Sequence, residues 1–241
     1  LFAEMGLKLF RTSICWSRIY PNGDDLEPNR EGIEWYRSML GECKKHGIKT
    51  FVTMLHYDIP VNLVTTYGGW KNRKTIDFFA RYVETITELG DLVDFWLPFN
   101  EFNAARFSPW DGVCLVKDEE GENFDRAIFQ CLHHEFVANA RAVEIVHRLS
   151  PDTPVGGMIA RFCTYPATCR PEDNMQAIHD DQYSNWFYTD VMARGKYPAY
   201  MNRYFDACDI EIQMEPGDEE LIARNTVDFL AFSYYFSQVS T

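Results

Sequence analysis

The stretch Asp94-Phe95-Trp96-Leu97-Pro98-Phe99-Asn100-Glu101 decides how this sequence is interpreted. Its first part is short, apolar and rich in aromatic residues, which predicts a buried β-strand. The strand would end in an amide and a carboxylic acid, Asn100 and Glu101. A buried carboxylate without a partner is costly, so such groups are paired, protonated or used in chemistry. Taken alone, Asn100-Glu101 could equally cap the next segment, and only its context favours a site.

Four further segments have the composition of strands, and amphipathic helices alternate with them. The predicted strands are 9–16, 49–56, 154–160 and 228–235. The predicted helices are 31–46, 76–86, one that begins at 128 and is stopped near Pro151, 175–195 and 218–225. Residues 1–8 read as the last turns of another helix. Strands that alternate with helices predict a parallel sheet with helical crossovers.

Such a sheet is either open and doubly wound or closed into a (β/α)8 barrel. The phosphate-binding glycine fingerprint of a dinucleotide-binding open sheet does not follow the first strand. The barrel is favoured because four strands place polar groups at or near their carboxyl ends, where barrels build active sites. A closed barrel needs eight strands, so we expect residues 1–241 to form a single partial domain with about strands 2 to 6 of a TIM barrel.

The composition limits the partners of this chain. Its 23 Lys and Arg against 36 Asp and Glu give a net charge of −13, which opposes nucleic acid and anionic lipid as main partners. A small neutral ligand fits more easily, and an anionic one would need a local basic pocket. No apolar run is long enough to span a membrane. The acidic run Asp118-Glu119-Glu120 predicts a solvated loop. Self-association as a homo-oligomer is left open.

The seven cysteines are scattered and form no C-x-x-C pair, so they predict reduced thiols and a cytoplasmic protein. Cys163 and Cys169 lack the spacing of a zinc site. No Gly-x-Ser-x-Gly motif is present, which argues against a serine hydrolase of that type. We therefore expect neither a metal nor another cofactor.

Glu101 is a candidate general acid/base for glycoside hydrolysis, which commonly uses two carboxylates on either side of the scissile bond. Asn100 could hydrogen-bond a sugar hydroxyl, while His56 could supply a polar contact and Trp16 an apolar platform. Taken singly, His56 is better explained as a satisfied core histidine. Trp16 is likewise better explained as a packing aromatic, so the site depends on the residues acting together.

With their flanks, these segments resemble glycoside hydrolase family 1, the retaining β-glycosidases built on a (β/α)8 barrel. The matching segments are Phe10-Arg11-Thr12-Ser13-Ile14-Cys15-Trp16-Ser17-Arg18-Ile19-Tyr20-Pro21-Asn22-Gly23, Leu55-His56-Tyr57-Asp58-Ile59-Pro60, Tyr67-Gly68-Gly69-Trp70, Phe99-Asn100-Glu101 and Asp228-Phe229-Leu230-Ala231-Phe232-Ser233-Tyr234-Tyr235. Several motifs in the family's order are more specific than any one alone. One departure is Pro98, where the family usually has Thr, because proline removes a backbone donor from a central strand.

The resemblance implies a role for each matching residue. Glu101 matches the general acid/base, which protonates the leaving oxygen and later deprotonates water. Asn100 matches a contact to the sugar 2-hydroxyl, and His56 matches a contact to the same ring. Arg11 and Tyr235 match the pair that holds the nucleophilic carboxylate and keeps it ionised.

In the family, that nucleophile lies in a Thr/Ile-Glu-Asn-Gly segment on the seventh strand, which we expect beyond Thr241. A glutamine contact from the first strand is expected before Leu1. We therefore expect the 241 residues alone to be inactive, and a truncated or sugar-binding remnant remains an alternative. A different barrel enzyme with Glu101 as a lone base is another alternative, which requires that the other site residues fail to gather around it.

Other segments resemble the phosphoglycosidase branch of the family. They are Asn100-Glu101-Phe102-Asn103, Cys131-Leu132-His133-His134-Glu135, residues 165–173 and residues 193–198. We therefore favour a 6-phospho-β-glucosidase over an ordinary β-glucosidase or β-galactosidase, with a phosphorylated β-glucoside as substrate. The phosphate-binding residues of that branch belong to a later part of the family's sequence. Adjacent His133 and His134 point about 100° apart on a helix, so they predict packing and not joint metal binding.

Overall fold

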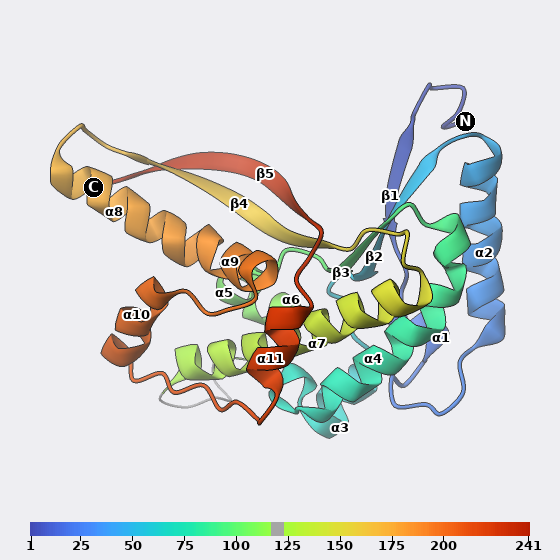
Figure 1. The fold of residues 1–241 in the computed structure, drawn as a ribbon, viewed down its shortest axis with the longest axis horizontal. Coiled ribbons are helices and arrows are strands. Elements are labelled where there is room, and N and C mark those ends of the chain that lie inside the picture. Colours follow the sequence, from blue (N-terminus) through green and yellow to red (C-terminus); the bar gives the residue numbers. More distant parts are fainter. Residues whose placement is uncertain (117–122) are drawn as a thin grey trace.

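The structure, a computed structural model, describes residues 1–116 and 123–241, so the acidic run Asp118-Glu119-Glu120 lies outside the described residues. Strands and helices alternate along the chain as the sequence predicts (Figure 1). The strands are β1 (Leu9–Ser13), β2 (Lys49–Leu55), β3 (Phe95–Phe99), β4 (Gly156–Pro166) and β5 (Phe229–Ser240). The α-helices are α1 (Trp16–Ile19), α2 (Arg30–Lys45), α3 (Val61–Tyr67), α4 (Lys74–Ile86), α5 (Ala104–Phe107), α6 (Pro109–Val113), α7 (Phe124–Leu149), α8 (Pro171–Asp181), α9 (Phe187–Arg194), α10 (Asn202–Ala207) and α11 (Asp218–Arg224).

All strand pairs are parallel, and neighbouring strands follow the order of the sequence. β1, β2 and β3 form one sheet, and β4 and β5 form another. A parallel bridge between Trp96 and Val155 joins the two sheets. The ladder between β2 and β3 pairs Thr53 with Leu97 and Leu55 with Phe99, and thus passes over Pro98. Within the described residues these two joined sheets do not close into a barrel, and β1 and β5 are their outer edges.

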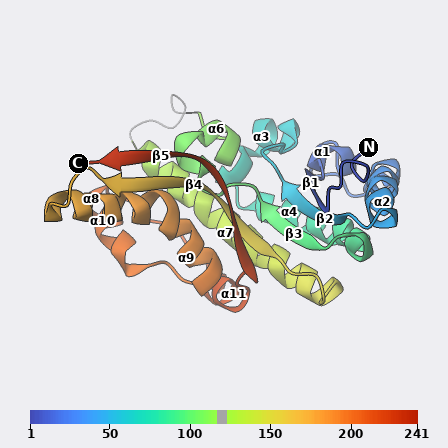
Figure 2. The same ribbon diagram turned by 90° about the horizontal axis from the view of Figure 1, so that it is seen from above.

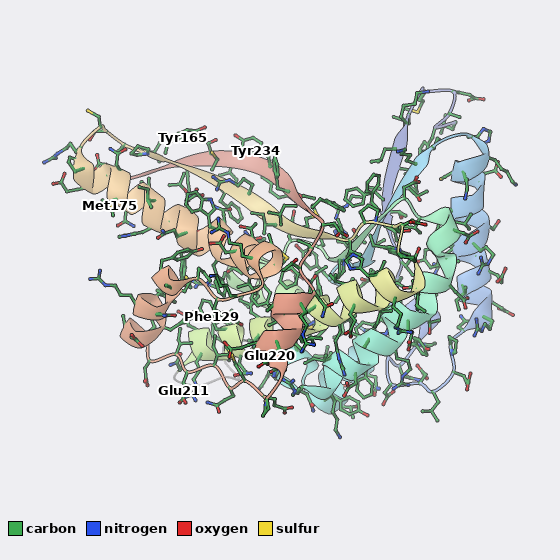
Figure 3. The ribbon with its side chains drawn as sticks, in the orientation of Figure 1. Phe129, Tyr165, Met175, Glu211, Glu220 and Tyr234 are labelled. Carbon is green, nitrogen blue, oxygen red and sulfur yellow. The ribbon has the colours of Figure 1, made fainter. Side chains whose placement is uncertain are left out.

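Helices cover the sheets on the side of the core. Figure 2 shows α2 and α4 beside β1 to β3, α8 and α9 beside β4 and β5, and α7 running between these groups. On the outer face, Tyr165 of β4 and Tyr234 of β5 are exposed, whereas Phe129 of α7 is buried among the helices (Figure 3). Among the helices of the described residues, none has the length and apolar character needed to cross a bilayer.

The long helix α7 is the central packing element. Its N-cap Asn123 accepts a hydrogen bond from the Arg126 N–H at 2.9 Å, which satisfies one of the free donors of the first turn. Its buried face runs from Ile128 to Val146. The helix ends at Leu149, two residues before Pro151, because the residue before a proline is disfavoured in helical conformation.

The amino-terminal segment differs from its prediction, because residues 1–7 form a turn without a regular helix. The Leu7 N–H bonds the Phe2 carbonyl at 3.1 Å, and the Gly6 N–H bonds the Ala3 carbonyl at 3.0 Å. With Gly6 at a φ of 78°, this is the Schellman arrangement that commonly ends helices. The turn therefore has the hydrogen bonds of a helix end, although it is too short to be a helix.

A buried polar network joins α4, α7 and α11. Asp218 accepts two hydrogen bonds from Arg73, at 2.9 and 2.5 Å, and lies 2.9 Å from His133 Nε2. The Nδ1 of His133 lies 3.1 Å from the Tyr197 hydroxyl. Burial by itself would raise the pKa of Asp218, but the hydrogen bonds from Arg73 and His133 outweigh it and lower the pKa to about 2. The ionised carboxylate therefore stabilises the packing of α11 on α7.

We expect Asp218→Asn to lower the free energy of unfolding by about 2 kcal/mol near pH 7, from the difference between a pKa of 3.8 and one of about 2. Because the folded pKa is depressed, this stabilisation is present above the unfolded value and is lost as the pH falls through about 2. Urea unfolding at several pH values measures it, with the exposed Asp152→Asn as control. A loss that stays constant down to pH 2 would contradict this account.

Candidate active site

Glu101 lies two residues after β3, in a backbone conformation that non-glycine residues seldom adopt. Its φ is 33°, and Tyr57, two residues after β2, has a φ of 70°. Cys114 also has a positive φ, and all three residues line one small cavity near the carboxyl ends of β2 and β3. Such conformations cost on the order of 1–3 kcal/mol each and cluster at functional sites. The backbone strain therefore marks this rim as the candidate active site.

Both carboxylate oxygens of Glu101 accept hydrogen bonds, and the residue is only 5% exposed. Tyr57 OH donates to Oε2 at 2.8 Å, and Tyr235 OH donates to Oε1 at 2.6 Å. Burial, followed by the bond to Glu101, raises the pKa of Tyr57. The bond to Glu101, followed by burial, raises the pKa of Tyr235. Both tyrosines are therefore neutral donors near pH 7, as hydrogen bonding to a carboxylate requires.

Arg11 of β1 lies beside this pair and orients Asn100. Its Nη2 donates to Asn100 Oδ1 at 2.7 Å and to Thr53 Oγ1 at 3.0 Å. Burial lowers the pKa of Arg11, while the charge of Glu101 and the Tyr235 hydroxyl act in the opposite direction. Arginine remains charged in proteins, so a fixed positive charge lies next to the candidate acid.

His56 lies at the rim and is exposed. Its backbone N–H bonds Asp58 Oδ1 at 3.1 Å, and its ring meets Tyr57 edge-on, with centroids 5.3 Å apart. Partial desolvation of the ring lowers the pKa of His56, and the positive charge of Arg11 lowers it further. His56 is thus an accessible, neutral imidazole at neutral pH and not the satisfied core histidine considered above.

Trp16 is placed differently from its prediction. Its side chain is completely buried, stacked on Tyr82 with centroids 5.3 Å apart and edge-on to Phe79 at 5.5 Å. The predicted strand 9–16 ends at Ser13, and Trp16 instead begins α1. The chain turns before Trp16 and directs the ring into the core, so the predicted apolar platform for a sugar is wrong and the packing alternative is correct.

Two residues that build this site, Tyr57 and Asn103, were not predicted as site residues from the sequence. Tyr57 adjoins His56 in a quoted motif, and its place just after a strand was the available signal. Asn103 follows Glu101 and ties its loop to β4, since its side chain bonds both the carbonyl at 2.7 Å and the N–H of Ala160 at 2.8 Å. It also donates to the Ser184 carbonyl at 2.9 Å. Asn103 therefore supports the loop that carries the acid.

Across residues 1–116 and 123–241, no cluster of three or more His, Cys, Asp or Glu side chains is arranged to hold a metal ion. The two adjacent histidines of α7 have separate partners. His133 meets Asp218, whereas the Nδ1 of His134 lies 2.8 Å from the Trp70 carbonyl oxygen. Each ring thus connects α7 to a different neighbouring segment.

Comparison with known proteins finds named glycosidases that are similar to this chain. A family model described as glycosyl hydrolase family 1 matches residues 1–241. The 6-phospho-beta-glucosidase AscB of Escherichia coli is 50% identical over 100% of this chain and 50% of its own length. The aryl-phospho-beta-D-glucosidase BglH of Bacillus subtilis is 49% identical over 100% of this chain and 51% of its own. The chain therefore spans about half the length of the curated relatives it matches.

Solved structures agree with these matches. Virulence factor SghA from Agrobacterium tumefaciens, in complex with its substrate analog salicin, has a TM-score of 0.83 at 31% identity, covering 99% of this chain and 51% of its own. A family 1 β-glucosidase from Thermotoga maritima has a TM-score of 0.83 at 27% identity, covering 98% and 52%.

The two hydrogen bonds on Glu101 differ in length and in burial, so their loss shows which of the two properties decides the contribution to stability. We expect Tyr57→Phe to lower the free energy of unfolding by about 1.5–3 kcal/mol, as for a hydrogen bond to a charged group. Tyr235→Phe should cost less although its bond is shorter, because Tyr235 is 61% exposed and water can replace it. Urea unfolding of both variants, each also combined with Glu101→Gln, measures the coupling. A larger loss for Tyr235→Phe would refute this ranking.

Proposed function

Because this chain belongs to glycosyl hydrolase family 1, we propose that the protein is a retaining β-glycosidase that hydrolyses 6-phospho-β-D-glucosides. The observation that carries the proposal is the placement of Arg11, Tyr57, Asn100 and Tyr235 around Glu101. Tyr57 and Asn100 follow the carboxyl ends of β2 and β3, whereas Arg11 lies within β1 and Tyr235 within β5. Residues from separate parallel strands thus meet at one place, as they do in the active sites of barrel enzymes.

The fold supports the same proposal. We place β1 to β5 at about strands 2 to 6 of a (β/α)8 barrel, within one domain over residues 1–241. The strands follow one another in parallel with helical crossovers. The edge strand β5 exposes large apolar side chains, among them Phe232 at 66% and Val239 at 67%. Further strands of a barrel would cover such a surface.

In the proposed reaction, protonated Glu101 gives its proton to the glycosidic oxygen while a second carboxylate attacks the anomeric carbon. The aglycone leaves as an alcohol, and a covalent glycosyl–enzyme forms. Glu101, now ionised, takes a proton from water, and the hydroxide attacks the same carbon. The bond to the second carboxylate breaks, which returns both groups to their starting states. We assign the second carboxylate to a part of the protein outside residues 1–241, as the resemblance implies.

The neighbours of Glu101 then have distinct roles. Arg11 holds the Asn100 side chain, so that its amide can meet the sugar 2-hydroxyl. The exposed His56 contacts the same sugar ring. Tyr57 and Tyr235 orient the Glu101 carboxylate. The resemblance gives Arg11 and Tyr235 the second carboxylate to hold, and because Tyr235 has a single O–H, it would leave Glu101 to do so. A lone-base enzyme of another kind is disfavoured, because that alternative requires these groups to lie apart.

The phosphorylated substrate is supported by the relatives. Chains named as phospho-β-glucosidases, such as AscB, are up to 50% identical to this one, whereas beta-glucosidase 42 of Arabidopsis thaliana is 32% identical over 99% of this chain and 49% of its own. The ordinary β-glucosidase is therefore the second candidate, and a free-sugar substrate distinguishes the two.

The whole protein should hydrolyse nitrophenyl β-glucoside 6-phosphate with a higher kcat/KM than the unphosphorylated nitrophenyl β-glucoside. Release of nitrophenol, followed by absorbance, measures both reactions. We expect residues 1–241 alone to hydrolyse neither, because the second carboxylate is absent from them. Rapid hydrolysis by the isolated 241 residues would falsify that assignment, and a preference for the free glucoside would favour the second candidate.

In the whole protein, Glu101→Gln should slow glycosylation by about 10²–10⁴-fold with a poor leaving group. The loss should be smaller with nitrophenol, which leaves without full protonation. Steady-state and burst kinetics on alkyl and nitrophenyl substrates separate the steps, with the exposed Glu144→Gln as control. An equal loss on all substrates would count against acid catalysis by Glu101.

A further inference from the structure

A second glutamate lies behind the candidate acid and has no role in the reaction described so far. Glu135 belongs to the middle of α7 and is 3% exposed. Within residues 1–116 and 123–241, the structure shows no hydrogen bond or ion pair to its carboxyl group. A buried carboxyl group without a partner is costly, so its presence requires an explanation.

Glu135 and Glu101 line the same cavity, which has a volume of about 10 Å³. That is close to the space of one water molecule, for which about 10–15 Å³ is needed. The polar residues of the lining are Tyr57, Asn100, Glu101, Asp111, Cys114 and Glu135. A buried water typically needs two to four polar partners, and this lining can supply them.

Among the described residues, the titratable groups that line the cavity with Glu135 or interact with it electrostatically are neutral or acidic. They are Glu101 and Tyr57 after β3 and β2, Asp111 of α6, Cys114 after α6 and Tyr188 of α9. Burial, with a contribution from Glu135, raises the pKa of Cys114 to about 12, so its thiol is neutral. Burial likewise raises the pKa of Glu135 well above its ordinary value of 4.5. A carboxyl group buried in a small cavity beside neutral and acidic side chains is more stable protonated than ionised, so we treat Glu135 as a carboxylic acid with a proton to donate.

We propose that Glu135 is a positioning residue for Glu101: its neutral carboxyl group donates a hydrogen bond to one water molecule in the shared cavity, and this water bridges to the Asn100-Glu101 segment. The positioning of Glu101 for catalysis rests on the proposed function, whereas the water-binding acid does not. The bridge supports a loop whose backbone is strained at Glu101. Because Glu135 is uncharged, it adds no repulsion when Glu101 ionises between the two steps.

The protonation of Glu135 is tested through the stability of the whole protein. Because its folded pKa is raised, the stability that Glu135 contributes is fully present below the unfolded value of 4.5 and is lost as the pH rises through the folded value. Glu135→Gln has the shape of the protonated acid but cannot ionise. We expect its unfolding constant, relative to wild type, to fall about tenfold per pH unit above 4.5 until the folded pKa of Glu135 is reached.

Urea unfolding between pH 4 and 8 measures this ratio. Glu144→Gln is the matched control, because it makes the same change at an exposed position of the same helix. The unfolding constant of Glu144→Gln, relative to wild type, should not fall as the pH rises. Wild type should also have an infrared band of a protonated carboxyl group that Glu135→Gln lacks. A ratio that does not change with pH, or the absence of that band, would show that Glu135 is not protonated in the folded protein and would overturn the proposal.

The bridge itself is tested by a crystal structure of the whole protein. We expect an ordered water within hydrogen-bonding distance of the Glu135 carboxyl group and of a polar atom of Asn100 or Glu101. In Glu135→Leu the water should be lost, and the bond from Tyr57 to Glu101 should lengthen. An empty cavity in wild type, or an unchanged Glu101 in Glu135→Leu, would overturn the proposal.

Activity separates the positioning role from a merely structural one. We expect Glu135→Leu to lose at least tenfold in kcat on nitrophenyl β-glucoside 6-phosphate with little change in KM, and to change the pH profile. Glu135→Gln, which keeps a donor, should restore most of the loss. Equal losses in both variants would overturn the positioning role. A wild-type protein without glycosidase activity would instead refute the proposed function. The stability and crystal results would then still decide whether Glu135 is protonated and binds a water molecule.

Discussion

The two hydrogen bonds on the Glu101 carboxylate are the interaction on which the rest of the site depends. They join the loop after β2, the loop after β3 and the strand β5 at one point. A hydrogen bond to a charged group contributes about 1.5–3 kcal/mol, which is comparable to the cost of holding Tyr57 and Glu101 in left-handed conformations. The bonds and the strain therefore offset one another and keep the acid in one orientation.

Parallel strand pairing explains why these residues meet. The carboxyl ends of β1, β2 and β3 lie at the same edge, so Arg11 reaches Asn100 across 89 positions of sequence. The result is a local charge pattern unlike that of the whole chain. A protein with a net charge of −13 places an arginine beside its candidate acid and surrounds the carboxylate with neutral hydroxyl donors.

The helix α7 supports this rim from behind. Its buried face carries His133, which shares Asp218 with Arg73 and joins α7 to α4 and α11. The next residues present His134 to the Trp70 carbonyl and Glu135 to the cavity of Glu101. A single helix thus fixes three neighbouring segments, and the polar groups on it serve packing and the site at once.

The sequence by itself determined the order of the five strands and of the longer helices between them, because apolar periodicity and stop signals such as Pro151 are local properties. Ordered motifs that resemble one family also predicted Glu101, Asn100, Arg11, His56 and Tyr235 as site residues. Only the tertiary structure decided that Trp16 faces the core, that Tyr57 bonds the acid and that Glu135 is buried with no hydrogen-bond partner among residues 1–116 and 123–241. The physical reason is that exposure and hydrogen bonding depend on neighbours supplied by distant segments, which no local pattern records.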